Sequence, residues 1–546
     1  MSLSPSAVGP VPEETARIAR AAFSKGNPYL KLRDELGTLF EDRDFIELFS
    51  KRGHPSYAPW RLALITVLQF LENLSDRQAS EAVRSRIDWK YLLGLELSDA
   101  GFDHSVLSGF RDRLVSNRRQ ELLLDRVLEL LREKKLLKER GKQRTDSTHV
   151  LAAIRGMNRI ELVMETMRAA LNDLAEATPL WLSGIAPVEW FVRYAARIED
   201  ARLPRSEKAR VELAETVGAD GFYLLERIRH EQPDLLKRES IEILERVWQR
   251  HYARDEAGEA HWRRSEELGP AAGAIESPYD RDARHSRKRE TVWTGYKVHF
   301  SETCDEKSPR LITNVRTSGA TEQDVSATAD IHKALARKRL LPDRHLVDAG
   351  YVDAELLVES KKRFGVELFG PTRVNPSWQA RTGGYAADHF TIDWQEQTAK
   401  CPEGKSSSYW HEYRNQADGR ELVKIRFSAK DCRVCLNRAK CVRASGAGRS
   451  LQVPARELYQ ALEQTRAKLA SEAGKEEYKR RAGVEGTISQ ATRRGAARRS
   501  RYRGLEKTHL QEVAAATGIN LLRTVAFLSG QAVAKTRVSR FKRLAN

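Results

Sequence analysis

Apolar residues recur with a helical period from Tyr29 to about Leu137. The run 59–71 predicts a buried helix that begins at a proline and stops near Asn73. Ser75 and Gln78 then form a capping-box pattern, which predicts the start of a second helix after a short turn. Residues 1–137 are therefore expected to form an all-helical domain.

The pattern changes to alternating, β-branched segments further along the chain. Strands are expected at 290–300 and 310–316, and a short polar strand is expected around Asp146. A helix from Asp324 to Arg337 precedes a short strand that begins at His345, and another helix and strand follow between 353 and 369. Alternation of strands and helices with an antiparallel ribbon predicts an α/β core.

Two long segments interrupt this core. Residues 151–275 return to a helical period and predict an all-helical insertion, and residues 371–448 carry most of the cysteines. The expected core consists of 138–150, 276–370 and 449–530, followed by a basic tail at 531–546.

Charge narrows the class of partner. The formal net charge is +18 with a pI near 9.6, and ten Lys or Arg residues but only two acids lie between Lys479 and Lys507. Such clustering favours a polyanion, and nucleic acid is the natural one. The helix pair before Arg86 is compatible with a helix-turn-helix DNA reader, and also with an antiparallel pair that never contacts DNA. No apolar run of 18 residues and no secretory signal pattern is present, so we expect a cytosolic protein with no membrane partner.

The five cysteines do not suggest a disulfide framework. Cys432 and Cys435 form a Cys-x-x-Cys motif, with Cys401 and Cys441 nearby. Four thiolates suit a structural Zn²⁺ ion, and a reduced thiol cluster is the alternative. Cys304 stands apart and is expected to be structural.

Three acids are the candidate catalytic groups. Asp146 and Asp348 lie at strand-like runs, and Glu485 lies alone in the basic stretch, where helical spacing would put Tyr478, Arg481 and Glu485 on one face. The plain alternative for Glu485 is an ion pair with Arg481 on a solvated helix. Three carboxylates could hold two Mg²⁺ or Mn²⁺ ions for phosphodiester cleavage, in a ribonuclease-H-like arrangement.

Several of these motifs together resemble the DDE transposases of bacterial insertion sequences, most closely the IS eleven-eighty-two lineage. The resemblance covers nearly the whole chain. It is carried by segments 57–59 and 74–78, 146–150, 296–299, 345–351, the cysteines from Cys401 onward, the Tyr478, Arg481 and Glu485 signature, and 499–504. One position departs from the signature, because Thr492 stands where a lysine is expected, with Arg493 next to it.

The resemblance implies a ribonuclease-H-like core that cleaves DNA at the element's ends and joins the freed 3′ hydroxyl to target DNA. It implies that Asp146, Asp348 and Glu485 hold two metal ions, that the amino-terminal helices bind terminal inverted repeats, and that the protein works in the nucleoid as a homodimer or larger assembly. The expected DNA contacts are Tyr478, Arg481, Arg493, Arg498, Arg499, Arg501, Arg503, Lys507, Arg77, Gln78 and Arg84. A structure-specific nuclease and a catalytically silent DNA-binding relative remain the alternatives.

Overall fold

The computed structural model describes residues 2–197, 203–373, 375–495 and 497–531. The basic tail expected at 531–546 lies outside these residues, apart from residue 531. Within the described part of the chain, no helix is both long enough and apolar enough to span a bilayer.

The amino-terminal region is helical, as the apolar period predicts. The capping box expected before α4 forms, because the Gln78 amide donates to Ser75 Oγ at 3.2 Å and the Ser75 amide donates to Gln78 Oε1 at 2.8 Å. The helices are α1 (Glu13–Ala22), α2 (Pro28–Leu36), α3 (Pro59–Leu71), α4 (Asp76–Ser85), α5 (Ile87–Leu93), α6 (Ser105–Ser116) and α7 (Leu122–Glu133). Almost every residue of α3 is buried, which explains its continuous apolar run.

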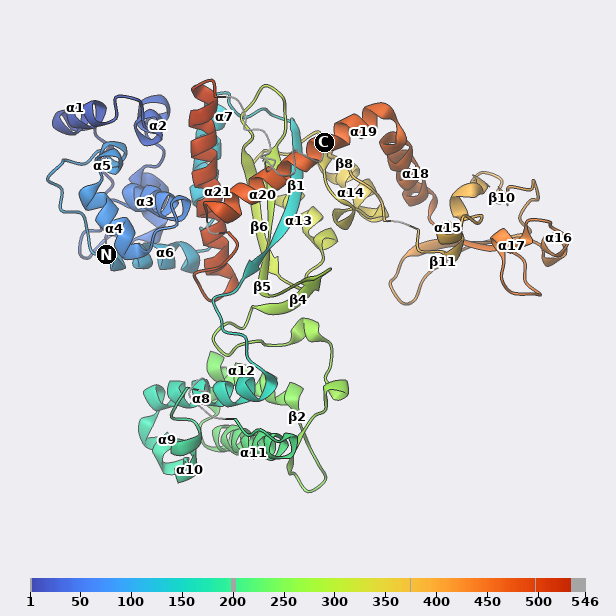
Figure 1. The fold of residues 1–546 in the computed structure, drawn as a ribbon, viewed down its shortest axis with the longest axis horizontal. Coiled ribbons are helices and arrows are strands. Elements are labelled where there is room, and N and C mark those ends of the chain that lie inside the picture. The colour runs from blue at the N-terminus through green and yellow to red at the C-terminus, as the bar shows by residue number, and fades with distance from the viewer. Residues whose placement is uncertain (1, 198–202, 374, 496, 532–546) are drawn as a thin grey trace, which may run out of the picture.

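A six-stranded mixed sheet forms the centre of the molecule (Figure 1). Its strands are β1 (Lys142–Leu151), β4 (Arg284–Lys288), β5 (Thr291–Thr303), β6 (Ile312–Gly319), β7 (Arg344–Leu346) and β8 (Glu367–Phe369). Along the sheet the order is β4, β5, β1, β7, β8, and β6 pairs with β5 on the same edge as β4. β1 is antiparallel to β5 and parallel to β7, and β7 is parallel to β8. The expected α/β class is confirmed.

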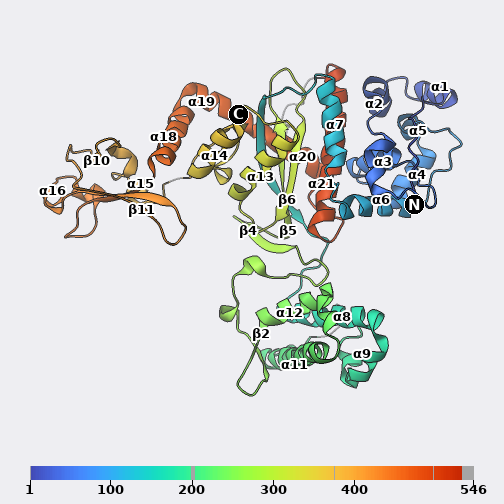
Figure 2. The ribbon, with the colours of Figure 1, turned by 180° about the vertical axis from the view of Figure 1, so that it is seen from behind.

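Four helices position the sheet and its site. The expected helix α13 (Asp324–Arg337) has the predicted bounds, and α14 (Ala354–Phe364) follows β7. α20 (Val484–Arg493) contacts β1 and β5, while α21 (Leu505–Leu528) packs against β6, α3 and α7. In Figure 1 and Figure 2, α21 stands between the amino-terminal helices and the sheet. One continuous hydrophobic core therefore runs from α3 through α21 to the sheet.

A buried ionic network fixes α20 over β1. Glu302 on β5 is completely buried and forms ion pairs with Arg144 on β1 at 2.6 Å and with Arg523 on α21 at 2.8 Å. Thr487 on α20 also donates to Glu302, and Arg523 donates to Thr487 at 2.7 Å. Although burial opposes it, the two arginines keep the pKa of Glu302 below its ordinary value. The network ties four elements that are far apart in sequence.

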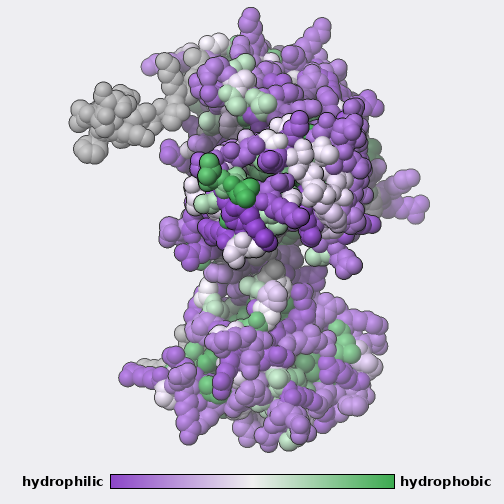
Figure 3. Space-filling model, turned by 90° about the vertical axis from the view of Figure 1, so that its right-hand side faces the viewer, coloured by the Kyte–Doolittle hydropathy of each residue, from purple (hydrophilic) through white to green (hydrophobic). Residues whose placement is uncertain are grey.

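The segment between β1 and β4 forms a separate lobe with its own hydrophobic core. Its helices are α8 (Arg159–Ala177), α9 (Pro179–Ile185), α10 (Val188–Arg193), α11 (Glu207–Glu231) and α12 (Glu239–His251). The expectation of an all-helical segment was wrong in one respect, because β2 (Tyr252–Arg254) and β3 (Ala260–Trp262) form a small hairpin. The rings of Tyr252 and Trp262 lie 5.1 Å apart across the hairpin, and the Tyr252 ring lies 5.3 Å from the ring of Trp248 on α12. Figure 3 shows this lobe joined to the rest of the molecule by a narrow waist.

The cysteine-containing segment contains two small sheets. β9 (Thr391–Asp393) pairs with β10 (Thr398–Lys400), and β12 (Glu421–Arg426) lies between β11 (Tyr409–Arg414) and β13 (Ser450–Pro454). Short helices flank them: α15 (Trp378–Thr382), α16 (Ala429–Arg433) and α17 (Arg438–Cys441). β13 lies beyond residue 448, where we expected the segment to end, yet it is hydrogen-bonded into the segment's sheet. The chain returns to the centre through α18 (Arg456–Ala470) and α19 (Glu472–Lys479).

Candidate functional site

Asp146 lies on β1, and Asp348 lies just beyond the end of the neighbouring parallel strand β7. The parallel register pairs Arg144 with Leu346, the last residue of β7, and each aspartate comes two residues further along the chain. The Asp348 carboxylate accepts a hydrogen bond from the Gly350 amide at 2.7 Å and caps a short turn. Carboxyl ends of parallel strands are where sites in α/β sheets gather. The sheet therefore assembles these two carboxylates.

Arg481 supplies the positive charge next to this pair. Its Nη1 lies 3.0 Å from Oδ2 of Asp146, and both side chains are mostly buried. Burial raises the pKa of the Asp146 carboxyl, the Ser147 amide and Arg481 oppose that rise, and Asp348 adds to it. Tyr478 lies within hydrogen-bonding reach of Arg481, and burial raises the pKa of the Tyr478 hydroxyl. Tyr478 and Arg481 thus sit at the carboxylates, as their spacing suggested.

Glu485 does not join them in this structure. It is exposed on the first turn of α20, and it makes no hydrogen bond or ion pair with another described residue. The helix that was expected to align it with Tyr478 is interrupted by a 3₁₀ segment, Arg480–Gly483. Each residue of a 3₁₀ helix turns the chain about 120° around the helix axis, instead of about 100° in an α-helix. Four such residues therefore rotate the direction of the Glu485 side chain by about 80° relative to a continuous α-helix. The expectation of one common face is therefore corrected for Glu485.

The donor chemistry at the pair suits Mg²⁺ or Mn²⁺, because both groups are hard oxygen ligands. The ion pair with Arg481 shows that the Asp146 carboxylate lies where it can interact with a cation. Among the described residues, however, no group of three or more Asp, Glu, His or Cys side chains has the arrangement of a metal site. Two of the three expected ligands are assembled.

A fourth acid, which the sequence did not single out, lies beside the pair. A Cβ placed on Gly350 would be 2.9 Å from Oδ1 of Asp348 and 3.3 Å from Oδ2 of Asp324, so both carboxylates border the same point. Lys297 donates to Asp324 at 2.9 Å, and Ser147, next to Asp146, donates to Asp324 at 3.3 Å. The buried Tyr351 hydroxyl experiences the charge of Asp146, Asp348 and Asp324 together. Helix periodicity marked Asp324 only as a helix start, and no local signal could have placed it here.

The other expected DNA contacts fall into two groups. Arg77, Arg493 and Arg499 are exposed, and no ion pair or side-chain hydrogen bond joins them to another described residue. The remaining side chains are already engaged within the protein: Gln78 in its capping box, Arg84 with the Ala100 carbonyl, Arg498 with His149, Arg501 with the Leu74 carbonyl, Arg503 over the Tyr279 ring and Lys507 with Asp112. Arg501 therefore ties the late basic segment to the turn between α3 and α4.

The four clustered cysteines lie close to one another. Burial raises the pKa of the Cys441 thiol, and Cys435, Cys432 and Cys401 add to that rise. Backbone amides of Lys405 and Arg449 donate to the sulfurs of Cys401 and Cys432 at 3.3 and 3.4 Å. The four thiols are near enough to affect one another's charge, although their geometry in the described chain is not that of a metal site. Cys304 is buried elsewhere, beside Leu346, and burial raises its pKa to about 12.

Two family models match separate parts of the chain. Residues 400–525 match the family model "Transposase DDE domain", and residues 18–113 match "Transposase domain (DUF772)". No curated protein and no solved structure matches the chain. The first match spans β13, α20 and much of α21, and the second spans most of the amino-terminal helices. Two separate parts of the chain, 18–113 and 400–525, are thus similar to transposase domains.

Proposed function

We propose that this protein is a DNA transposase that binds the terminal inverted repeats of an insertion sequence, hydrolyses phosphodiester bonds at its ends and joins the 3′ hydroxyl to target DNA. The observation that carries the proposal is that Asp146 on β1 and Asp348, just after the parallel strand β7, follow the same register pair at equal spacing, with Arg481 beside Asp146. The matched transposase domains support the choice of substrate.

The strand order supports a ribonuclease-H-like core. A three-stranded antiparallel ribbon, β6, β5 and β1, continues into two parallel strands, β7 and β8, and the first carboxylate is on the central β1. In this proposal the segments 151–275 and 371–448 are insertions, because each leaves the sheet and has a hydrophobic core of its own.

Asp146 and Asp348 would hold the metal ions, and Glu485 would be the third ligand. Two bound ions activate the attacking water or hydroxyl and stabilise the leaving oxygen. Through the ions that they would hold, Asp146 and Asp348 would position the scissile phosphate next to β1 and β7. Arg481, which now neutralises Asp146, can pair with a DNA phosphate once that carboxylate binds metal. Glu485 requires a rewinding of the 3₁₀ turn to reach the pair.

The decisive experiment uses duplexes that carry the inverted repeats flanking the gene, with Mg²⁺ or Mn²⁺, and compares the wild type with Glu485→Gln. We expect the wild type to cut and the variant to bind without cutting. Pre-cut ends incubated with a target plasmid then separate the reactions, because joined products require a transposase and nicking alone indicates a nuclease. If the wild type binds the ends but never cuts them, the proposed chemistry is wrong and the protein is a DNA-binding relative.

A further inference from the structure

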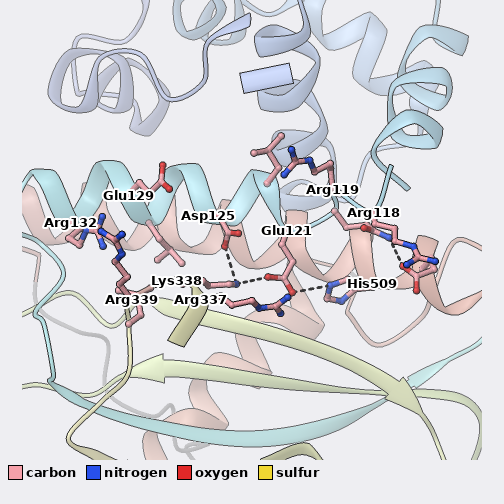
Figure 4. A pocket seen from close by; sticks show the side chains of 15 residues that line it. Arg118, Arg119, Glu121, Asp125, Glu129, Arg132, Arg337, Lys338, Arg339 and His509 are labelled. Atoms are coloured by element: carbon pink, nitrogen blue, oxygen red, sulfur yellow. Dashed lines mark hydrogen bonds and ion pairs between the residues drawn. The ribbon is translucent and has the colours of Figure 1, made fainter. Parts of the chain in front are cut away.

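A basic cleft lies at the opposite end of α13 from Asp324. It has a volume of about 770 Å³ and is formed by the turn after α6, by α7, by the end of α13 and by the start of α21. Figure 4 shows side chains from α7 facing those at the end of α13 across this space. The fourteen residues of α13 rise about 20 Å, so the cleft is separate from the carboxylate pair.

The floor of the cleft is balanced in charge. Lys338, whose side chain is only 7% exposed, forms ion pairs with Glu121 at 2.9 Å and Asp125 at 3.0 Å. His509 approaches Glu121 from α21 at 3.8 Å. Burial opposes ionisation of Glu121, but His509 and Lys338 lower its pKa to about 2. The floor acids are thus satisfied by Lys338 and His509 and do not neutralise the rim.

Four arginines on the rim of the cleft have side chains without a partner in the described part of the protein. No ion pair or side-chain hydrogen bond joins Arg118, Arg132, Arg337 or Arg339 to any other residue in the described ranges. The other acids at the cleft have partners, since Glu129 pairs with Arg126 at 2.5 Å and Glu506 accepts from Gln120. Four guanidinium groups therefore face solvent around one opening.

Two of these arginines occupy backbone positions that favour glycine. Arg118 follows α6 with φ of 54°, and Arg339 follows α13 with φ of 57°. The left-handed conformation is unfavourable for a residue that carries a side chain. A cation near a helix carboxyl end offsets only part of that cost. Glycine would adopt both backbone positions more favourably than arginine does. Both positions nevertheless carry arginine, and both arginines line the same cleft.

We propose that this cleft binds the phosphate backbone of a duplex DNA segment without reading its bases. Guanidinium groups match phosphate in a two-pronged geometry. Among the described residues that line the cleft, only His509 carries a ring, and it is engaged with Glu121, so these residues offer no aromatic surface for base stacking. The inference rests on the proposed function in taking DNA as the polyanion, and it adds a second contact region, distant from the carboxylates and indifferent to sequence.

The test is the double variant Arg118→Gly with Arg339→Gly, in the full chain. Glycine removes the charge and relieves the left-handed backbone, so thermal stability should stay equal or rise. Binding of a fluorescent random-sequence duplex, measured by anisotropy without metal, should weaken. Each lost phosphate contact removes about 0.9 from the slope of log K against log salt, so the slope should fall by about 2.

The matched control is Arg205→Ala with Arg381→Ala, which removes two exposed arginines outside the cleft whose side chains form no ion pair or hydrogen bond with another described residue. This control variant should change the slope of log K against log salt by less than about 0.9, the value for one phosphate contact. Equal losses in both double variants would mean a general charge effect and overturn the proposal. Unchanged binding in the glycine variant would also overturn it.

A nucleotide is the other source of the same phosphate chemistry. If ATP displaces the duplex from the wild type at concentrations near its own affinity, and the glycine variant alone loses ATP binding, the cleft is a nucleotide site and the DNA assignment is wrong. These binding measurements do not require DNA cleavage. Their result can therefore be interpreted even if the protein does not cut or join DNA.

Discussion

Arg481 and Asp146 are 335 residues apart in the chain, yet Nη1 of the arginine lies 3.0 Å from Oδ2 of the aspartate. The contact joins the 3₁₀ turn before α20 to the centre of β1, across a chain that leaves the sheet twice in between. Because Asp146 is the residue that we propose to hold metal, its partner in the present structure controls both its charge and its availability.

Replacing Arg481 by alanine should lower cleavage of the element ends and leave the fold intact. Arg481 lowers the pKa of Asp146, so its removal raises that pKa further above the ordinary value. Since metal binding requires the carboxylate, the acid limb of the pH–rate profile should move to higher pH. Arg481→Lys keeps the charge and is the control. An acid limb that stays in place in Arg481→Ala would remove Arg481 from the site.

Replacing Asp324 by asparagine should reduce cleavage by about 10- to 100-fold, the range for residues that orient metal ligands. The change weakens the contact with Lys297 and alters the group that borders Asp348 and Ser147. Asp330→Asn is the matched control, because Asp330 is an exposed acid on the same helix with partners away from the site. Mg²⁺ dependence is the second readout, and a half-saturating concentration equal to that of the wild type would argue for a merely structural Asp324.

Local patterns predicted much of the fold. The Pro59 start of α3, the Ser75 capping box and the bounds of α13 depend on residues a few positions apart, and all three are confirmed. The sequence also placed Asp146 in a strand and Asp348 at the end of one, and the structure has Asp146 within β1 and Asp348 two residues after β7. Their roles as metal ligands stay a prediction.

Contacts between distant segments were not predictable in the same way. Glu485 was misplaced because the face argument assumed a uniform helix, and a 3₁₀ segment changes the rotation per residue. Asp324 and Lys297 meet only because β5 and the start of α13 lie side by side, which no periodicity encodes. Arg501 was expected to contact DNA, but it holds the turn after α3 instead.

Replacing Glu512 by glutamine should stabilise the protein at alkaline pH. Glu512 is completely buried in α21, neither carboxyl oxygen has a hydrogen-bond partner within the described part of the chain, and burial raises the pKa of Glu512 well above the ordinary value. The folded state therefore keeps a proton that the unfolded chain releases. Its contribution to the free energy of unfolding falls as pH rises above the unfolded pKa, by about 1.4 kcal/mol per pH unit.

The measurement is the melting temperature of both proteins between pH 5 and pH 8. The gap between variant and wild type should be small at pH 5 and should widen toward pH 8. A constant gap would mean that the Glu512 carboxyl does not hold its proton in the folded state.

Purified protein should contain one zinc ion for each chain if the four clustered thiols are a metal site. Cys401, Cys432 and Cys435 act electrostatically on Cys441, and three of the four, Cys401, Cys432 and Cys441, pack against the small core around Phe427. Thiolates must lose their protons to bind the ion, so zinc should be released as pH falls. Metal content by elemental analysis, compared between Cys435→Ser and Cys304→Ser, tests this directly, because Cys304 is buried at the central sheet and outside the cluster. Loss of zinc in Cys435→Ser alone would establish the site, whereas a wild type without zinc and with four thiols that react with a thiol reagent would identify a reduced cluster.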